Sequence, residues 1–131
     1  MSEKQKLLIV DDSELNRDIL KEILGSRYDY MEAENGTQAI QILEVHPEID
    51  LMLLDINMPQ MNGFQVLEHM RELQWIDEVP VVMISSEESV EIMRKAYDLG
   101  ITDYISRPFD AVIVKKRVQN TLGLYANQKR L

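Results

Sequence analysis

The chain has 131 residues, a size that fits one domain with a real core but is short for two. Its net charge of -9 at pH 7 argues against general binding to nucleic acid or to an anionic membrane surface, because phosphate groups attract a positive footprint. There is no cysteine, which excludes a disulfide scaffold and a thiolate metal site, and no signal peptide or membrane-spanning run is recognisable. We therefore expect a cytoplasmic protein.

The first half of the chain alternates apolar runs with helical patterns. Residues 7–10 predict a buried strand, and Ser13 can cap a helix that Gly25 ends. The inner face of this helix is expected to carry the apolar residues at helical spacing: Leu15, Ile19, Leu20, Ile23 and Leu24. A weaker strand at 30–33 follows, and then a short helix that begins at Thr37, ends at His46-Pro47 and buries Ala39, Ile40 and Leu43.

The second half repeats this alternation. Apolar runs predict strands at 51–55 and 81–84, and a shorter strand is expected at 104–106. The helices between them have apolar stripes made of Val66, Leu67, Met70 and Leu73, and of Val90, Met93 and Ala96 or Tyr97. Glu87 and Glu88 are expected in the first turn of the latter helix, where carboxylates suit the helix dipole, and Gly100 is expected to end it.

Five strands alternating with five helices predict an α/β fold, a doubly wound five-stranded parallel sheet of the flavodoxin-like type. Asp110 is expected to cap the final helix, whose pattern occupies roughly 110–131 and runs past Tyr125 without a Gly or Pro stop. This ending leaves two interpretations open. The final residues are either a frayed surface tail or the start of a connector to an output domain of a longer protein.

Polar side chains follow three of the predicted strands at the point where each strand ends. Asp55 ends the central run, Asp11-Asp12 follow the first strand, and Ser85-Ser86 follow the fourth. The carboxyl ends of parallel strands share one edge of the sheet, which is where ligands bind in open α/β folds. Two carboxylates ~4 Å apart repel by ~4 kcal/mol at an effective dielectric of ~20. A proton or a hard divalent cation would resolve this conflict, and Mg²⁺ is the best candidate for a site built from oxygen ligands.

Four motifs together resemble the receiver domain of two-component response regulators. They occur in the family's order and spacing over essentially the whole chain: Asp11-Asp12, Asp55-x-x-Met58-Pro59-x-Met61-x-Gly63, Ser85, and Tyr104-x-x-Arg107-Pro108-Phe109. The resemblance implies a fold like that of the chemotaxis response regulator and a phosphoacceptor role for Asp55. It also implies that Asp11 and Asp12 hold Mg²⁺ with help from Asp55 and the main-chain carbonyl of Asn57.

The resemblance assigns further roles to the last two motifs. Ser85 matches the Ser or Thr that bonds the phosphoryl group, and Tyr104 matches the aromatic residue whose rotamer changes on activation. The bond before Pro108 is expected to be cis. Arg107 stands where receivers almost always have Lys, and this exchange is not conservative because a guanidinium is planar, larger and bidentate. It leaves open whether Arg107 clamps the phosphoryl group or locks a permanent ion pair with Asp55.

The leading interpretation is a signalling switch and not an enzyme, beyond its own phosphorylation and dephosphorylation. A sensor histidine kinase or phosphotransfer protein would phosphorylate Asp55, and the face made by the fourth helix, fifth strand and last helix would control an output or form a homodimer. The extended final helix and the sequence Arg107-Pro108-Phe109-Asp110 resemble receivers that are attached to cyclic-dinucleotide signalling enzymes. The alternative is a phosphorylation-independent pseudo-receiver that docks or dimerises because Arg107 fixes one state. An Asp-nucleophile phosphatase is disfavoured, since Asn57 stands where its second acid is needed, and a flavin carrier lacks its phosphate loop.

Overall fold

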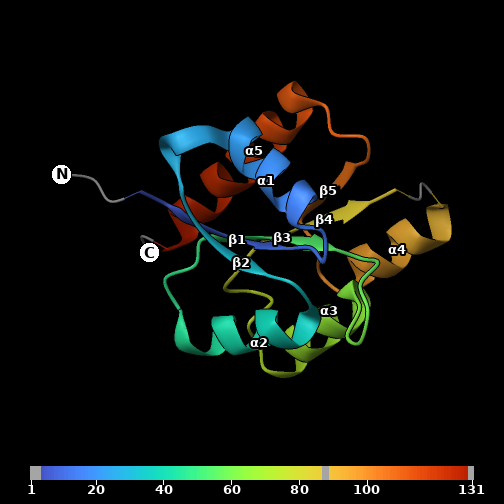
Figure 1. Ribbon diagram of the computed structural model, residues 1–131. Helices are drawn as coiled ribbons and strands as arrows, with labels where there is room; N and C mark the ends of the chain where they lie inside the picture. Colours follow the sequence, from blue (N-terminus) through green and yellow to red (C-terminus); the bar gives the residue numbers. More distant parts are fainter. Residues whose placement is uncertain (1–3, 87–88, 130–131) are drawn as a thin grey trace.

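The computed structural model describes residues 4–86 and 89–129, which form one five-stranded parallel sheet covered by helices on both faces (Figure 1). The strands are β1 (Lys6–Val10), β2 (Asp29–Ala33), β3 (Leu51–Asp55), β4 (Val81–Ser85) and β5 (Asp103–Ser106). The helices are α1 (Glu14–Leu24), α2 (Gly36–Val45), α3 (Gly63–Glu72), α4 (Val90–Asp98) and α5 (Ala111–Lys129), with a short 3₁₀ turn at Gly25–Arg27. The predicted α/β fold is confirmed.

The strand order is β2-β1-β3-β4-β5. The strand β2 is added on one side of β1, and β3, β4 and β5 are added on the other side. Figure 1 shows α1 and α5 on one face of the sheet and α2 and α3 on the other. Alternate residues of each strand supply the two cores: in β1, Leu7 and Ile9 pack with α1 and α5, whereas Leu8 and Val10 pack with α2 and α3. Both faces of the central strands are therefore buried, which explains their continuous apolar sequences.

Several predicted helix ends agree with the structure. Ser13 caps α1 by accepting a hydrogen bond from the Asn16 amide at 3.3 Å, and Asp110 caps α5 through the Ile113 amide at 3.1 Å. Helix α2 begins at Gly36, one residue before the predicted start, because the Asn35 side chain caps it. The described part of the chain has no helix that is both long and apolar enough to cross a membrane.

Two predicted helix faces are only partly correct, since Leu20, Leu24 and Ala96 are buried as expected but other members are not. Leu15 is 68% exposed, and Arg17 is instead among the buried residues of α1, because the inward face runs through positions 17, 20 and 24. In α4 the described residues bury only Ala96, while Val90 is 63% and Tyr97 is 44% exposed. Helix α4 begins at Val90; the predicted first turn at Glu87 and Glu88 lies outside the described residues.

Candidate functional site

Asp55 is a buried carboxylate at the last position of β3, the central strand. Its Oδ1 accepts a hydrogen bond from the Asn57 amide at 3.1 Å. Helix α3 begins close behind it, because Gly63 lacks the side chain that would meet the Asp55 carbonyl oxygen at 2.7 Å. A reciprocal capping box between Asn62 and Gln65 fixes the start of α3. The backbone on both sides of Asp55 is therefore held in place.

Asp11 and Asp12 approach Asp55 from the end of β1, the neighbouring strand. One carboxylate oxygen from each of these three residues lies within 4.8 Å of the others. Asp11 is fully buried, and its Oδ1 accepts a hydrogen bond from the Ser13 amide at 2.9 Å. Asp12 is exposed and lines a hollow of about 460 Å³ beside the loop after β3. The predicted acidic pocket thus has two buried carboxylates and one that faces solvent.

Arg107 is the cation of this pocket. Its Nη2 lies 2.6 Å from Asp11 Oδ2 and 3.1 Å from Asp55 Oδ2, so one nitrogen bridges both buried acids. The peptide bond between Arg107 and Pro108 is cis. The Arg107 amide donates to the Ser85 carbonyl at 3.1 Å, which ties this residue to the end of β4. Its Nε is buried and has no hydrogen-bond partner among the described residues.

The environment of Asp55 disfavours its charged form. Burial raises the pKa of the Asp55 carboxyl from its ordinary value of 3.8 to about 6, because the carboxylate loses hydration. The Asn57 amide and the Arg107 guanidinium lower this pKa, whereas the charge of Asp11 raises it. The carboxylate is still mostly ionised at pH 7, and it would be stabilised by an additional positive charge in the pocket.

Ser85 and Ser86 end β4 at the same edge of the sheet, but they differ in exposure. Ser85 is buried and Ser86 is exposed. Because β3 and β4 are paired with Asp55 opposite Ile84, Ser85 lies one position beyond the level of Asp55. Of the two hydroxyls, Ser85 has the burial expected of a residue that contacts a group bound at Asp55.

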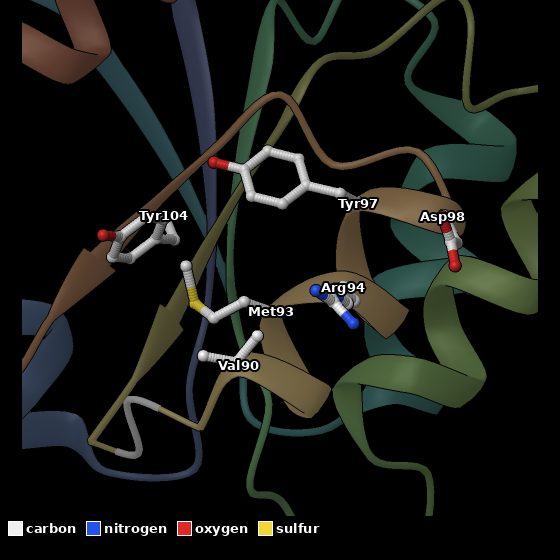
Figure 2. A pocket seen from close by; sticks show the side chains of 6 residues that line it. All are labelled: Val90, Met93, Arg94, Tyr97, Asp98 and Tyr104. Atoms are coloured by element: carbon white, nitrogen blue, oxygen red, sulfur yellow. The ribbon is translucent and has the colours of Figure 1, made fainter.

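Tyr104 lies in β5 and faces a different part of the surface. It lines a hollow of about 500 Å³ together with residues of α4: Val90, Met93, Arg94, Tyr97 and Asp98. Figure 2 shows the Tyr104 side chain from β5 near the Tyr97 and Met93 side chains from α4. Arg117 of α5 lies over the Tyr104 ring, 4.7 Å from its centroid, and donates a hydrogen bond to the Tyr104 carbonyl. The Tyr104 ring therefore belongs to the α4–β5 surface.

Arg17 is a residue of the site that our sequence analysis missed. Its side chain is buried, and Nη1 donates to the Asp11 carbonyl oxygen at 2.6 Å. The available signal was its spacing, since Arg17, Leu20 and Leu24 recur on one helical face. The inner face predicted for this helix contains apolar residues alone.

The donor set fits a hard divalent cation. All three side chains offer oxygen, one of them faces solvent, and the described residues place a single arginine nitrogen against the two buried acids. Mg²⁺ binds through one or two carboxylates and keeps several waters, which requires such a partly open oxygen site. The residues present are therefore compatible with Mg²⁺.

Comparison with known proteins agrees with this arrangement. Residues 7–119 match the family described as the response regulator receiver domain. Chemotaxis protein CheY1 of Helicobacter pylori is 35% identical over 120 residues, covering 90% of this chain and 97% of that protein. A probable cyclic di-GMP phosphodiesterase of Vibrio cholerae is 34% identical over 116 residues, covering 88% of this chain but 26% of that protein.

Among solved structures, the chemotaxis response regulator CheY4 of Vibrio cholerae superposes with a TM-score of 0.83 at 27% identity, covering 91% of this chain and 99% of that chain. The match of the family to most of the chain, the similarity to CheY1 and the acidic pocket at the expected sheet edge lead to one assignment. The chain belongs to the response regulator receiver domain family, the phosphate-accepting signalling domains of two-component systems.

Proposed function

We propose that Asp55 is the residue that accepts the phosphoryl group. The observation that supports this most directly is the buried Asp55 carboxylate at the end of the central strand, within 4.8 Å of two further carboxylates and 3.1 Å from Arg107. A lone buried acid would tend to take up a proton. This one is surrounded by groups that can compensate additional negative charge.

The donor would be a phosphohistidine of a sensor histidine kinase or phosphotransfer protein. An Asp55 Oδ atom attacks phosphorus, an O–P bond forms, and the P–N bond to the imidazole breaks. The electron pair of that bond returns to the imidazole nitrogen, which takes up a proton. Asp55 must be ionised to attack, and the transfer otherwise needs mainly alignment and charge neutralisation. We expect no turnover by this domain beyond its own phosphorylation and dephosphorylation.

The other residues of the pocket would bind the phosphoryl group or Mg²⁺. Arg107 and the Ser85 hydroxyl would donate hydrogen bonds to the phosphoryl oxygens. Asp11, Asp12, Asp55 and the main-chain carbonyl of Asn57 would hold Mg²⁺. When bound, Mg²⁺ supplies positive charge that reduces the repulsion between these acids and the incoming phosphoryl group.

The α4–β5–α5 surface would pass the signal to a partner or to a second copy of the chain. Support comes from the hollow between Tyr104 and α4, whose side chains leave room to rearrange. The residues of this domain do not identify the process that it controls. The similarity to a Vibrio cholerae protein named as a probable cyclic di-GMP phosphodiesterase favours cyclic-dinucleotide signalling as one candidate output.

The test is an amide NMR titration of the chain with beryllofluoride and Mg²⁺, with Asp55→Asn as the control. Saturable shifts at Asp55, Ser85 and Tyr104 that are absent in Asp55→Asn are the expected result. A spectrum that does not respond would contradict phosphorylation at Asp55. It would favour the pseudo-receiver interpretation, for which the direct Arg107–Asp55 ion pair is the supporting observation.

A further inference from the structure

Arg17 is a buried cation that has no role in the phosphoryl transfer proposed above. Its guanidinium contacts one group directly after β1 and one on β2: Nη1 donates to the Asp11 carbonyl at 2.6 Å, and Nε donates to Glu32 Oε1 at 2.9 Å. The second carboxylate oxygen of Glu32 accepts a hydrogen bond from Lys21 at 2.8 Å. A buried guanidinium is strongly desolvated, so it needs such charged partners, and their geometry in turn fixes its position.

The anchor of this arrangement is Glu32 on the edge strand β2. In the parallel register Glu32 lies opposite Ile9 of β1, whose side chain belongs to the core on the α1 and α5 face. The Glu32 carboxylate is therefore on the face that α1 covers, where Arg17 reaches it. Lys21, one helical turn further along α1, holds the same carboxylate from its exposed side. The position of Arg17 is thus determined by β2 as well as by its own helix.

The oxygen that Arg17 binds belongs to the peptide group joining Asp11 to Asp12. A peptide group is planar, so an interaction that fixes its oxygen also fixes the direction in which Asp12 leaves it. The Asp11 amide is separately held by the Ala33 carbonyl at 3.1 Å, and its carboxylate by Ser13 and Arg107. The orientation of this peptide plane also affects how the two carboxylates are placed relative to each other, and the Arg17 guanidinium donates to its oxygen.

We propose that Arg17, anchored by Glu32, is a positioning residue for the divalent-cation site. It holds the Asp11–Asp12 peptide in the orientation that directs both carboxylates towards one cation. This inference rests on the proposed Mg²⁺ site, and it adds to that site a residue that donates to the main-chain oxygen of Asp11 and would not itself bind the cation.

A positioning role for Arg17 and simple electrostatics predict opposite changes in Mg²⁺ affinity when Arg17 is replaced. Arg17→Met removes a positive charge near an acidic pocket, which by charge alone would strengthen Mg²⁺ binding. If Arg17 positions the acids, Mg²⁺ binding instead weakens about tenfold, as is typical when a partner that orients metal ligands is removed. Arg17→Lys keeps the charge but replaces a planar fork by a single ammonium, so we expect an intermediate dissociation constant.

Lys21→Met is a matched control. It removes the same charge from the same helix and loses a contact with the same Glu32, but Lys21 has no hydrogen bond to Asp11. Its dissociation constant for Mg²⁺ should stay close to the wild-type value. Glu32→Ala keeps the guanidinium and removes its anchor, and it should weaken Mg²⁺ binding less than Arg17→Met.

The experiment is calorimetric titration of the whole chain with Mg²⁺ alone, without a phosphodonor, at a temperature where circular dichroism shows every variant to be folded. Weaker binding by Arg17→Met with an unchanged Lys21→Met supports the inference. An Arg17→Met variant that binds Mg²⁺ as tightly as wild type overturns it. If Arg17→Met does not fold, Arg17→Lys and Glu32→Ala decide in the same way. A wild-type chain without saturable Mg²⁺ binding would refute the metal site itself, which is a different result from equal binding by wild type and variant.

Discussion

The segment from β3 to α3 and the segment around α4 are built differently, although both border the acidic pocket. Every residue of β3 is buried, and α3 buries Gly63, Val66, Leu67 and Met70 behind a complete capping box. Of the described residues of α4, Ala96 alone is buried, and the Ser89 side chain makes no cap hydrogen bond. Side chains of α4 and Tyr104 also line a hollow of about 500 Å³.

This difference separates two requirements of a switch. Groups that react must be held in a fixed geometry, which the dense packing behind Asp55 provides. A surface that changes its partner must be able to move at low free-energy cost, and an element with few buried contacts satisfies that condition. If this contrast exists in solution, substitutions near β3 and α3 should change stability more than matched substitutions in α4.

Gly63→Ala tests the rigid side of the contrast. An added Cβ would lie 2.7 Å from both the Asp55 carbonyl oxygen and Ile56 Cα, and backbone atoms cannot move aside as side chains do. We expect the free energy of unfolding to fall by about 4 kcal/mol, measured by urea denaturation. Gly123→Ala is the control, because its Cβ would meet none of the described atoms within 4 Å, and it should be slightly stabilising. Equal effects of the two changes would contradict the close approach at Gly63.

A pair of methionine truncations compares the packing of the two helices directly. Met70 of α3 is fully buried, so Met70→Ala should cost about 3 kcal/mol of unfolding free energy through lost contacts and a residual cavity. Met93 of α4 is half-buried at the hollow beside Tyr104, so Met93→Ala should cost less than about 1 kcal/mol. Thermal and chemical unfolding of both variants would measure the difference. Similar losses would show that α4 is as firmly packed as α3.

Asp55→Asn tests the cost of keeping a charge in the rigid segment. Folding raises the pKa of the Asp55 carboxyl from 3.8 to about 6, so the folded chain binds this proton more tightly than the unfolded chain does. The stability that Asp55 contributes is complete below about pH 4 and is lost as the pH rises through about 6. Without divalent cations, Asp55→Asn should therefore be more stable than wild type at pH 7 by about 2 to 3 kcal/mol.

The measurement is the free energy of unfolding of both proteins between pH 4 and pH 7. The advantage of Asp55→Asn should disappear towards the acidic end, where the wild-type carboxyl is protonated in both states. If wild type were more stable than Asp55→Asn at pH 7, Arg107 would compensate the buried charge of Asp55 fully.

The two helix caps provide the smallest test. Asn62 accepts a hydrogen bond from the Gln65 amide at 3.0 Å, so Asn62→Ala should lower the free energy of unfolding by about 1 kcal/mol. Ser89 occupies the same position of α4 without a side-chain cap bond, and Ser89→Ala should leave stability close to wild type. Urea midpoints of the two variants are sufficient. A larger loss for Ser89→Ala would reverse the contrast between the two helices.

The sequence predicted the strands and the acids because both depend on local patterns. Continuous apolar runs that end in Asp11-Asp12, Asp55 and Ser85-Ser86 are sufficient to place those residues at one edge of a parallel sheet. The face of α1 was predicted wrongly at Leu15 for a physical reason. Arg17 is buried because its charge is satisfied by Glu32, fifteen positions away on another strand, and no helical periodicity encodes that partner.

The ion-pair partners of Arg107 could likewise not be predicted from the sequence alone. Its position before Pro108 suggested an ion pair with Asp55, but the closer contact is with Asp11 at 2.6 Å, across 96 positions of the chain. The exposure of α4 is a third case. The spacing predicts a buried stripe of Val90, Met93 and Ala96 or Tyr97. Of these, Ala96 is buried, whereas Val90 and Tyr97 are exposed.

The strand order has a consequence for how the domain loses structure. The two strands that deliver the acids, β1 and β3, are neighbours, and each has a hydrogen-bonded partner on both sides, whereas β2 and β5 each have one free edge. Local opening begins most easily at free edges, so amide hydrogens of β2 and β5 should exchange with solvent before those of β1 and β3. The strand that carries Asp55 should therefore keep its pairing after either edge of the sheet has frayed.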